Sequence, residues 1–115
     1  MRALVSYYAV LDNRVPPPGV PNLLTEEERL AFSPAAHLGA GPRPLPPMLI
    51  ARAGQDNPRL NTTVDTFVEA ALASGLTLEL LNRPAGRHGF DVLDDDARSH
   101  EILARTFDFL KTHLD

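Results

Sequence analysis

The chain of 115 residues is long enough for one domain with a hydrophobic core. Its formal net charge of −4 disfavours nucleic-acid binding, and the absence of cysteine excludes disulfides and thiolate chemistry. No apolar run approaches the roughly 20 residues of a membrane span. We therefore predict a cytoplasmic protein without a signal peptide, and with neither a nucleic-acid nor a membrane partner.

Residues 3–9 form an apolar run rich in β-forming residues, which predicts a strand. This strand begins almost at residue 1, so nothing before it in the chain covers one of its edges. Natural proteins usually pair or cover a long apolar edge. The strand therefore indicates either an incomplete domain or an edge that pairs with another chain.

Residues 12–47 hold nine of the eleven prolines, and proline continues neither a helix nor a central strand. We predict a long insertion at the surface with short helices in it. Thr25 and Glu28 have the spacing of a capping box, which predicts one helix start. Ser33 before Pro34 predicts a second start, with Ser33 as the N-cap.

Two further apolar runs, residues 48–53 and 76–82, are bounded by proline or glycine and are typical of strands buried on both faces. Between them, apolar residues recur at helical spacing. Asn61 is the predicted N-cap of this helix, which ends near Ser74 with Gly75 after it. This order is a βαβ unit, so its two strands should be parallel.

A final helix should follow the three aspartates at 94–96, because acidic side chains stabilise the positive end of the helix dipole. Its predicted apolar stripe consists of Leu103, Phe107, Leu110 and Leu114. The predicted fold class is α/β, with three layers: a parallel sheet of about three strands and helices that flank it. We expect a single partial domain over residues 1–115, in which residues 48–115 form a βαβα unit.

Asp56 follows the first strand of the βαβ unit, and His88 follows the second. Because the carboxyl ends of parallel strands meet at one edge of a sheet, we expect these two side chains to lie together. A carboxylate beside an imidazole is the pair that activates a hydroxyl in Ser-His-Asp hydrolases. Taken singly, Asp56 also fits a simple turn residue, and His88 fits a loop histidine bonded to a backbone carbonyl.

Two stretches of the sequence resemble the α/β-hydrolase superfamily. Residues 53–56, Ala-Gly-Gln-Asp, resemble its acid loop, and residues 86–90, Gly-Arg-His-Gly-Phe, resemble its histidine loop in the dienelactone hydrolase and acetyl-esterase-like branch. Residues 2–8 resemble the strand before the insertion between nucleophile and acid. The resemblance covers nearly the whole chain, but only the carboxyl-terminal half of the family's domain. It implies that Asp56 and His88 are the acid and the base of an ester or dienelactone hydrolase.

The nucleophile elbow of this family, Gly-x-Ser-x-Gly, does not occur in the sequence. None of the serines is predicted at a strand-to-helix elbow; they are Ser6, Ser33, Ser74 and Ser99. We therefore predict half of a serine hydrolase, which acts on a small ester once a nucleophile-bearing segment completes it. We predict no cofactor and no metal, because the remaining histidines, His37, His100 and His113, lack metal-ligand spacing.

Two other functions remain open. The chain could be a non-catalytic α/β module that forms a homo-oligomer through the strand at residues 3–9. It could also be a flavodoxin-like binding domain, although residues 11–14 form no glycine-rich phosphate loop after the first strand.

Overall fold

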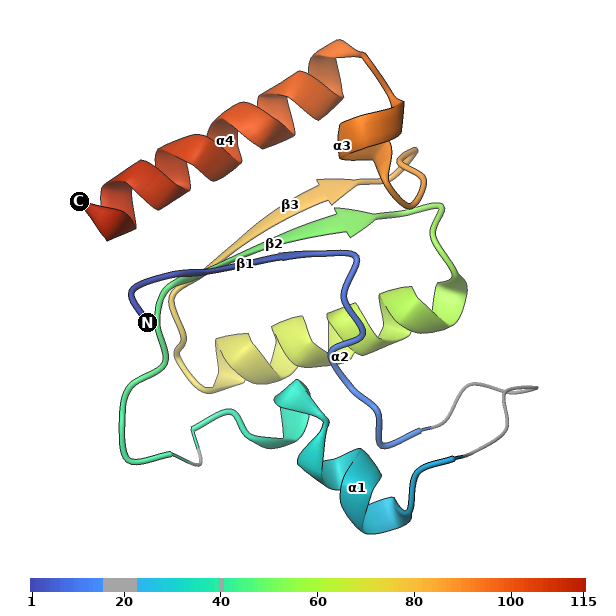
Figure 1. Ribbon diagram of the computed structural model, residues 1–115, viewed down its shortest axis with the longest axis vertical. Helices are drawn as coiled ribbons and strands as arrows, with labels where there is room; N and C mark the ends of the chain where they lie inside the picture. The colour runs from blue at the N-terminus through green and yellow to red at the C-terminus, as the bar shows by residue number, and fades with distance from the viewer. Residues whose placement is uncertain (16–22, 40) are drawn as a thin grey trace.

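A parallel sheet lies at the centre of the computed structural model, which describes residues 1–15, 23–39 and 41–115. In that part of the chain the sheet has the order β1-β2-β3, and both neighbouring pairs are parallel. The strands are β1 (Leu4–Tyr7), β2 (Met48–Ala53) and β3 (Leu78–Arg83). The arrows of β2 and β3 point the same way in Figure 1, and β1 runs parallel to β2, so the carboxyl ends of the three strands share one edge. The predicted α/β fold with a parallel sheet is confirmed.

Helices cover both faces of the sheet (Figure 1). The helix α2 lies on one face together with α1 and the short 3₁₀ helix η1, whereas α3 and α4 lie on the other face. The helices are α1 (Glu26–Ala31), η1 (Pro34–Ala36), α2 (Pro58–Ala73), α3 (Phe90–Leu93) and α4 (Ala97–Leu114). Helix α3 was not predicted from the sequence. The result is the predicted three-layer arrangement.

The central strand β2 supplies both halves of the core, because successive side chains of a strand point to opposite faces. Ile50 packs with Val64 and Phe67 on the α2 side. Leu49 packs with Ile102 on the α4 side. Being covered on both faces, β2 is apolar without alternation, as parallel strands usually are.

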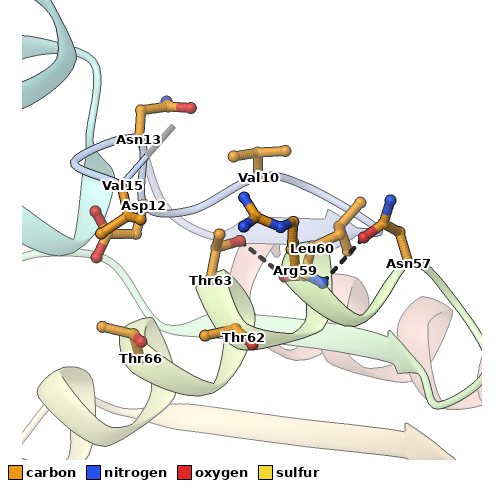
Figure 2. A pocket seen from close by; sticks show the side chains of 10 residues that line it. All are labelled: Val10, Asp12, Asn13, Val15, Asn57, Arg59, Leu60, Thr62, Thr63 and Thr66. Carbon is orange, nitrogen blue, oxygen red and sulfur yellow. Dashed lines mark hydrogen bonds between the residues drawn. The ribbon is translucent and has the colours of Figure 1, made fainter. Parts of the chain in front are cut away.

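The predicted start of α2 is wrong by one turn. Asn57 is the N-cap, and its side chain accepts a hydrogen bond from the backbone N–H of Arg59 at 3.0 Å (Figure 2). Pro58 occupies the first helical position, where its missing N–H costs nothing. Asn61 is instead buried within the helix, where its amide donates to the carbonyl oxygens of Ala53 at 2.9 Å and Gly54 at 3.3 Å.

The predicted apolar stripe of α4 is also wrong. Phe107 is 61% exposed and Leu114 is 49% exposed, although Leu110 does pack against the core. The buried side chains of α4 are Ser99, Ile102, Thr106 and Phe109. Thr106 tolerates burial because its hydroxyl bonds the Tyr7 hydroxyl at 2.6 Å and donates to the carbonyl of Ile102 at 2.9 Å.

The insertion between β1 and β2 contains the predicted capping box. The Glu28 N–H donates to the Thr25 hydroxyl at 3.2 Å, and the Thr25 N–H donates to the Glu28 carboxylate at 2.8 Å. Ser33, however, makes no capping bond; its buried hydroxyl accepts from the Asn13 N–H and donates to the Arg29 carbonyl, both at 2.7 Å. The three consecutive prolines at 16–18 lie outside the described residues.

Strand ends differ slightly from the predicted ones. Strand β1 stops at Tyr7 rather than at residue 9. Strand β3 starts at Leu78, two residues after the predicted start at residue 76, and ends at Arg83, one residue after the predicted end at residue 82. In the described part of the chain, no helix is both long enough and apolar enough to cross a membrane.

Candidate active site

The acid loop after β2 and the histidine loop after β3 are joined through their backbones. The N–H of Gly54 donates to the carbonyl of Arg83, and the N–H of Gln55 donates to that of Gly86, both at 2.8 Å. A side chain at position 54 has no room, since its Cβ would lie 2.3 Å from the carbonyl oxygen of Pro84. The two loops are therefore held at a fixed separation, which sets the positions of the side chains beyond them.

Asp56 and His88 lie together at the carboxyl edge of the sheet. The Nδ1 atom of His88 is 2.6 Å from Oδ2 of Asp56, and the other carboxylate oxygen accepts the backbone N–H of Asn57 at 2.7 Å. The side chain of Asp56 is only 7% exposed, whereas that of His88 is 61% exposed. A carboxylate can only accept, so Nδ1 carries the proton and Nε2 has its lone pair free to take another. No described residue hydrogen-bonds to Nε2, so this pair can act as a base.

Tyr8, which directly follows β1, lies at the same place and was not predicted from the sequence. Its ring centroid lies 4.8 Å from that of His88, and its hydroxyl donates to Oδ1 of Asp91 at 2.7 Å. Burial raises the pKa of Tyr8 above its usual range, and the hydrogen bond to Asp91 raises it further, so the phenol stays neutral. Its position directly after β1 was the signal that could have found it, because Asp56 and His88 were located by the same rule.

Tyr8 also has an unusual backbone. Its φ of 54° lies in the left-handed region, and no other non-glycine residue of the described part has a positive φ. Such a conformation costs a residue with a Cβ roughly 1–2 kcal/mol. The favourable contacts of the Tyr8 side chain with His88, Phe90 and Asp91 have to outweigh this cost.

Several ion pairs hold the segment that follows His88. Arg87 donates to Asp94 at 2.7 Å, and Arg83 bonds to both Asp96 and Ser99. The pKa of Asp96 is lowered, chiefly by the N–H of Ser99 and next by Arg83. The exposed aspartates that precede α4 are thus paired or capping, as expected of a helix start.

A hollow of about 410 Å³ lies between the turn after β1 and the first turns of α2 (Figure 2). Figure 2 shows Val10, Asp12 and Asn13 above it and the threonines of α2 below, with Asn57 at one end. Asp12, a residue of the turn after β1, pairs with Arg14 at 2.6 Å, and this hydrogen bond is the main cause of its lowered pKa. The walls mix apolar and hydroxyl groups, as small-molecule pockets commonly do.

None of the four serines lies on a turn between a strand and a helix. Ser6 lies within β1, Ser33 is buried in the insertion, and Ser74 caps the end of α2. Ser99 is buried in α4, where its hydroxyl donates to the carbonyl of Phe90 at 3.1 Å. The acid and the imidazole are therefore brought together without a serine placed as a nucleophile elbow.

Comparisons with known proteins point to esterases. No protein-family model matches the sequence, and no curated protein sequence does either. Solved structures of esterase 2 from the planctomycete Thermogutta terrifontis do match. Its propionate-bound form matches 96% of this chain with a TM-score of 0.74 and 28% sequence identity. Its butyrate-bound form matches 96% of this chain with a TM-score of 0.73 and 26% sequence identity. The form phosphorylated by paraoxon has a TM-score of 0.71 and 29% identity over 95%.

This chain spans less than half of the esterase that it resembles. The matches cover 42%, 43% and 39% of the propionate-bound, butyrate-bound and paraoxon-treated chains. They do not bear on the dienelactone hydrolase branch. The fold and these matches together support a relationship of this chain to the α/β-hydrolase superfamily.

Proposed function

We propose that this chain supplies the acid and the base of a carboxylic-ester hydrolase, with Asp56 as the acid and His88 as the base. The observation that carries the proposal is the 2.6 Å contact between Nδ1 of His88 and Oδ2 of Asp56 at the carboxyl edge of the sheet. The esterase neighbours add support. The nucleophile comes from a segment that pairs with this chain, as the resemblance implies.

The proposed chemistry uses Nε2 of His88 twice. As the nucleophile hydroxyl attacks the ester carbonyl carbon, its proton passes to Nε2, and the resulting imidazolium faces the carboxylate of Asp56. The tetrahedral intermediate then collapses, the bond to the leaving alcohol breaks, and that alcohol takes the proton from Nε2. A water molecule repeats the sequence to release the acid and restore the hydroxyl.

The proposed substrate is a small carboxylic ester. The neighbouring esterase has been solved with propionate and with butyrate, which are short acyl groups. A dienelactone, which is a cyclic ester, is the finer possibility that the histidine loop suggests. Neither substrate requires a cofactor or a metal in this mechanism.

A chimera tests the proposal. The segment of the Thermogutta esterase that matches this chain is replaced by residues 1–115, and hydrolysis of p-nitrophenyl butyrate is measured. We expect the chimera to be active and His88→Ala to lower kcat by roughly 10⁴-fold or more. The isolated chain should not exceed the rate of its own His88→Ala variant, since an Asp–His pair without a hydroxyl has little acyl-transfer power.

The control is His100→Ala, which removes an exposed histidine paired with Asp95 at 2.6 Å. Its kcat should match that of the unmodified chimera. A chimera that folds by circular dichroism yet hydrolyses nothing would refute the proposal, as would activity that persists in His88→Ala. The codons upstream of Met1 offer an independent check, because an in-frame Gly-x-Ser-x-Gly would identify the nucleophile segment.

The open side of β1 favours a second candidate, a non-catalytic module that forms a homo-oligomer. In the described part of the chain β1 has a strand neighbour on one side only, and a hollow of about 430 Å³ lies against it. The walls of the hollow are largely apolar and include Leu4, Met48 and Phe67, while the buried hydroxyl of Ser6 has no hydrogen-bond partner among the described residues.

Two copies joined through β1 would form a continuous six-stranded sheet. Light scattering should then give twice the chain mass of 12.6 kDa, and Val5→Pro should return the monomer, because proline disrupts strand pairing. Leu114→Ala is the control, since it changes an exposed side chain on the opposite face. A monomer at all concentrations would exclude this candidate and leave the edge open for a different chain.

A further inference from the structure

The ring of Tyr8 lies on the wrong face for a residue that continues strand β1. Side chains alternate along a strand, so Val5 and Tyr7 share one face while Ser6 and residue 8 should share the other. Ser6 does line the hollow on the α2 side. Tyr8 instead packs with Val5 and Tyr7 against the core on the α4 side. The positive φ at Tyr8 is what breaks the alternation and turns its ring to the same side as His88.

Three contacts fix the ring once it has turned, in addition to its edge-to-face contact with the neighbouring Tyr7 ring at 5.6 Å between centroids. It meets Phe90 edge to face at 5.4 Å between centroids, and its hydroxyl donates to Asp91 at 2.7 Å. Its third contact is the imidazole of His88, at 4.8 Å between centroids and with the planes tilted by 46°. Phe90 is fully buried, so the phenol stands on a rigid support.

The ring of His88 has few other restraints. Its side chain is largely exposed, and the hydrogen bond to Asp56 is the one polar contact it makes within the described residues. A single hydrogen bond between Nδ1 and Asp56 still lets the imidazole ring tilt about the line that joins the two atoms. Such a tilt would change the direction of the lone pair on Nε2. A base has to hold its lone pair in one direction to accept a proton efficiently.

We propose that Tyr8 is a positioning residue for His88, whose phenol ring fixes the plane of the imidazole while Asp56 fixes its tautomer. The proposal rests on the proposed function of His88 as a base. The imidazole centroid lies 4.8 Å from that of the neutral phenol ring, within the roughly 6 Å at which an aromatic ring attracts a cation, so Tyr8 also favours the imidazolium that forms during proton transfer. Asp91 acts on His88 only through Tyr8, because its carboxylate accepts the hydrogen bond of the Tyr8 hydroxyl and so holds the phenol ring in place.

Nuclear magnetic resonance of the 115-residue chain, labelled with ¹⁵N and ¹³C, tests this inference. In the native chain we expect nuclear Overhauser contacts between the Tyr8 ring and the carbon-bound ring protons of His88, together with a ring-current shift of those protons. Tyr8→Leu should abolish the ring-current shift and broaden or average the His88 ring signals. Tyr8→Phe keeps the ring and should restore the shift.

Tyr7→Leu is the matched control for a role in stability alone. Tyr7 also stacks on Phe90, at 6.4 Å, meets the Tyr8 ring edge to face at 5.6 Å and bonds to Thr106, but no ring contact joins it to His88. The Tyr7→Leu substitution should therefore lower the melting temperature of the chain and leave the His88 ring signals unchanged. Equal changes in His88 for the two leucine variants would overturn the inference.

The unmodified chain keeps the inference testable even if Tyr8→Leu fails to fold. Absence of the Tyr8–His88 Overhauser contacts in the native spectrum would overturn the inference without any variant. The esterase assay reports on what His88 does, whereas these spectra report on what holds its ring. The proposed function of His88 and the positioning role of Tyr8 can therefore be refuted independently of each other.

Discussion

Phe90→Ala is expected to lower the free energy of unfolding by about 3–5 kcal/mol, the range for deletion of a large buried aromatic ring. The side chain of Phe90 is 0% exposed, and the rings of Tyr7 and Tyr8 pack on it. The guanidinium of Arg83 lies 5.0 Å from the ring centroid. Removal of this ring leaves a cavity between the histidine loop and α4. Urea denaturation followed by circular dichroism measures the loss.

Phe107→Ala is the control for this substitution. It deletes the same ring from α4, but at a position that is 61% exposed. The free energy of unfolding should change by no more than about 0.5 kcal/mol. If Phe107→Ala proved as destabilising as Phe90→Ala, the buried face of α4 would be the predicted stripe and not the face that contains Ile102 and Phe109.

The sheet and the Asp56–His88 contact were predictable because each depends on local chemistry and one rule of chain connection. Apolar runs that end at proline or glycine specify the strands at 48–53 and near 78–83. A helix between two such strands makes them parallel, so the loops after them open at one edge. Asp56 and His88 each follow one of these strands within a few residues, which leaves little freedom in where they lie.

The two errors in the long helices have a different cause, since each involves a polar group whose hydrogen-bond partner lies outside its own helix. Thr106 lies in the buried face of α4 because Tyr7 supplies a hydrogen-bond partner 99 residues away. Asn61 is buried because the carbonyl groups of the acid loop accept its amide protons. Periodicity and capping rules take no account of such partners, so the predicted apolar stripe did not include Thr106, and Asn61 was predicted as a helix N-cap.

Tyr8 is the most informative of these cases. Its sequence context, two tyrosines within an apolar run, is typical of a strand, and the predicted strand continued through it to residue 9. Its left-handed backbone conformation is unfavourable in isolation. The contacts with His88, Phe90 and Asp91 explain why this conformation is adopted, and these residues lie in the histidine loop and at the start of α3, far along the chain from Tyr8.

Gly54→Ala is expected to lower the free energy of unfolding by about 1–3 kcal/mol, because the new methyl group has to push the histidine loop away. The Cβ at position 54 would lie 2.3 Å from the carbonyl oxygen of Pro84 and 2.6 Å from its Cα. Both are backbone atoms, so no side-chain rotation can relieve the clash. The hydrogen bond from the Gly54 N–H to Arg83, at 2.8 Å, should weaken at the same time.

The same displacement should reach the candidate site, since Asp56 is two residues from Gly54 and His88 is four residues from Pro84. We expect the Nδ1 proton signal of His88, which the bond to Asp56 protects, to disappear from the spectrum of Gly54→Ala. Gly41→Ala is the matched control: it adds the same methyl group where nothing lies within 4 Å, so both stability and the His88 signal should stay unchanged. If the Gly54 and Gly41 variants unfolded at the same urea concentration, the close approach of the two loops would not be what sets the Asp56–His88 distance.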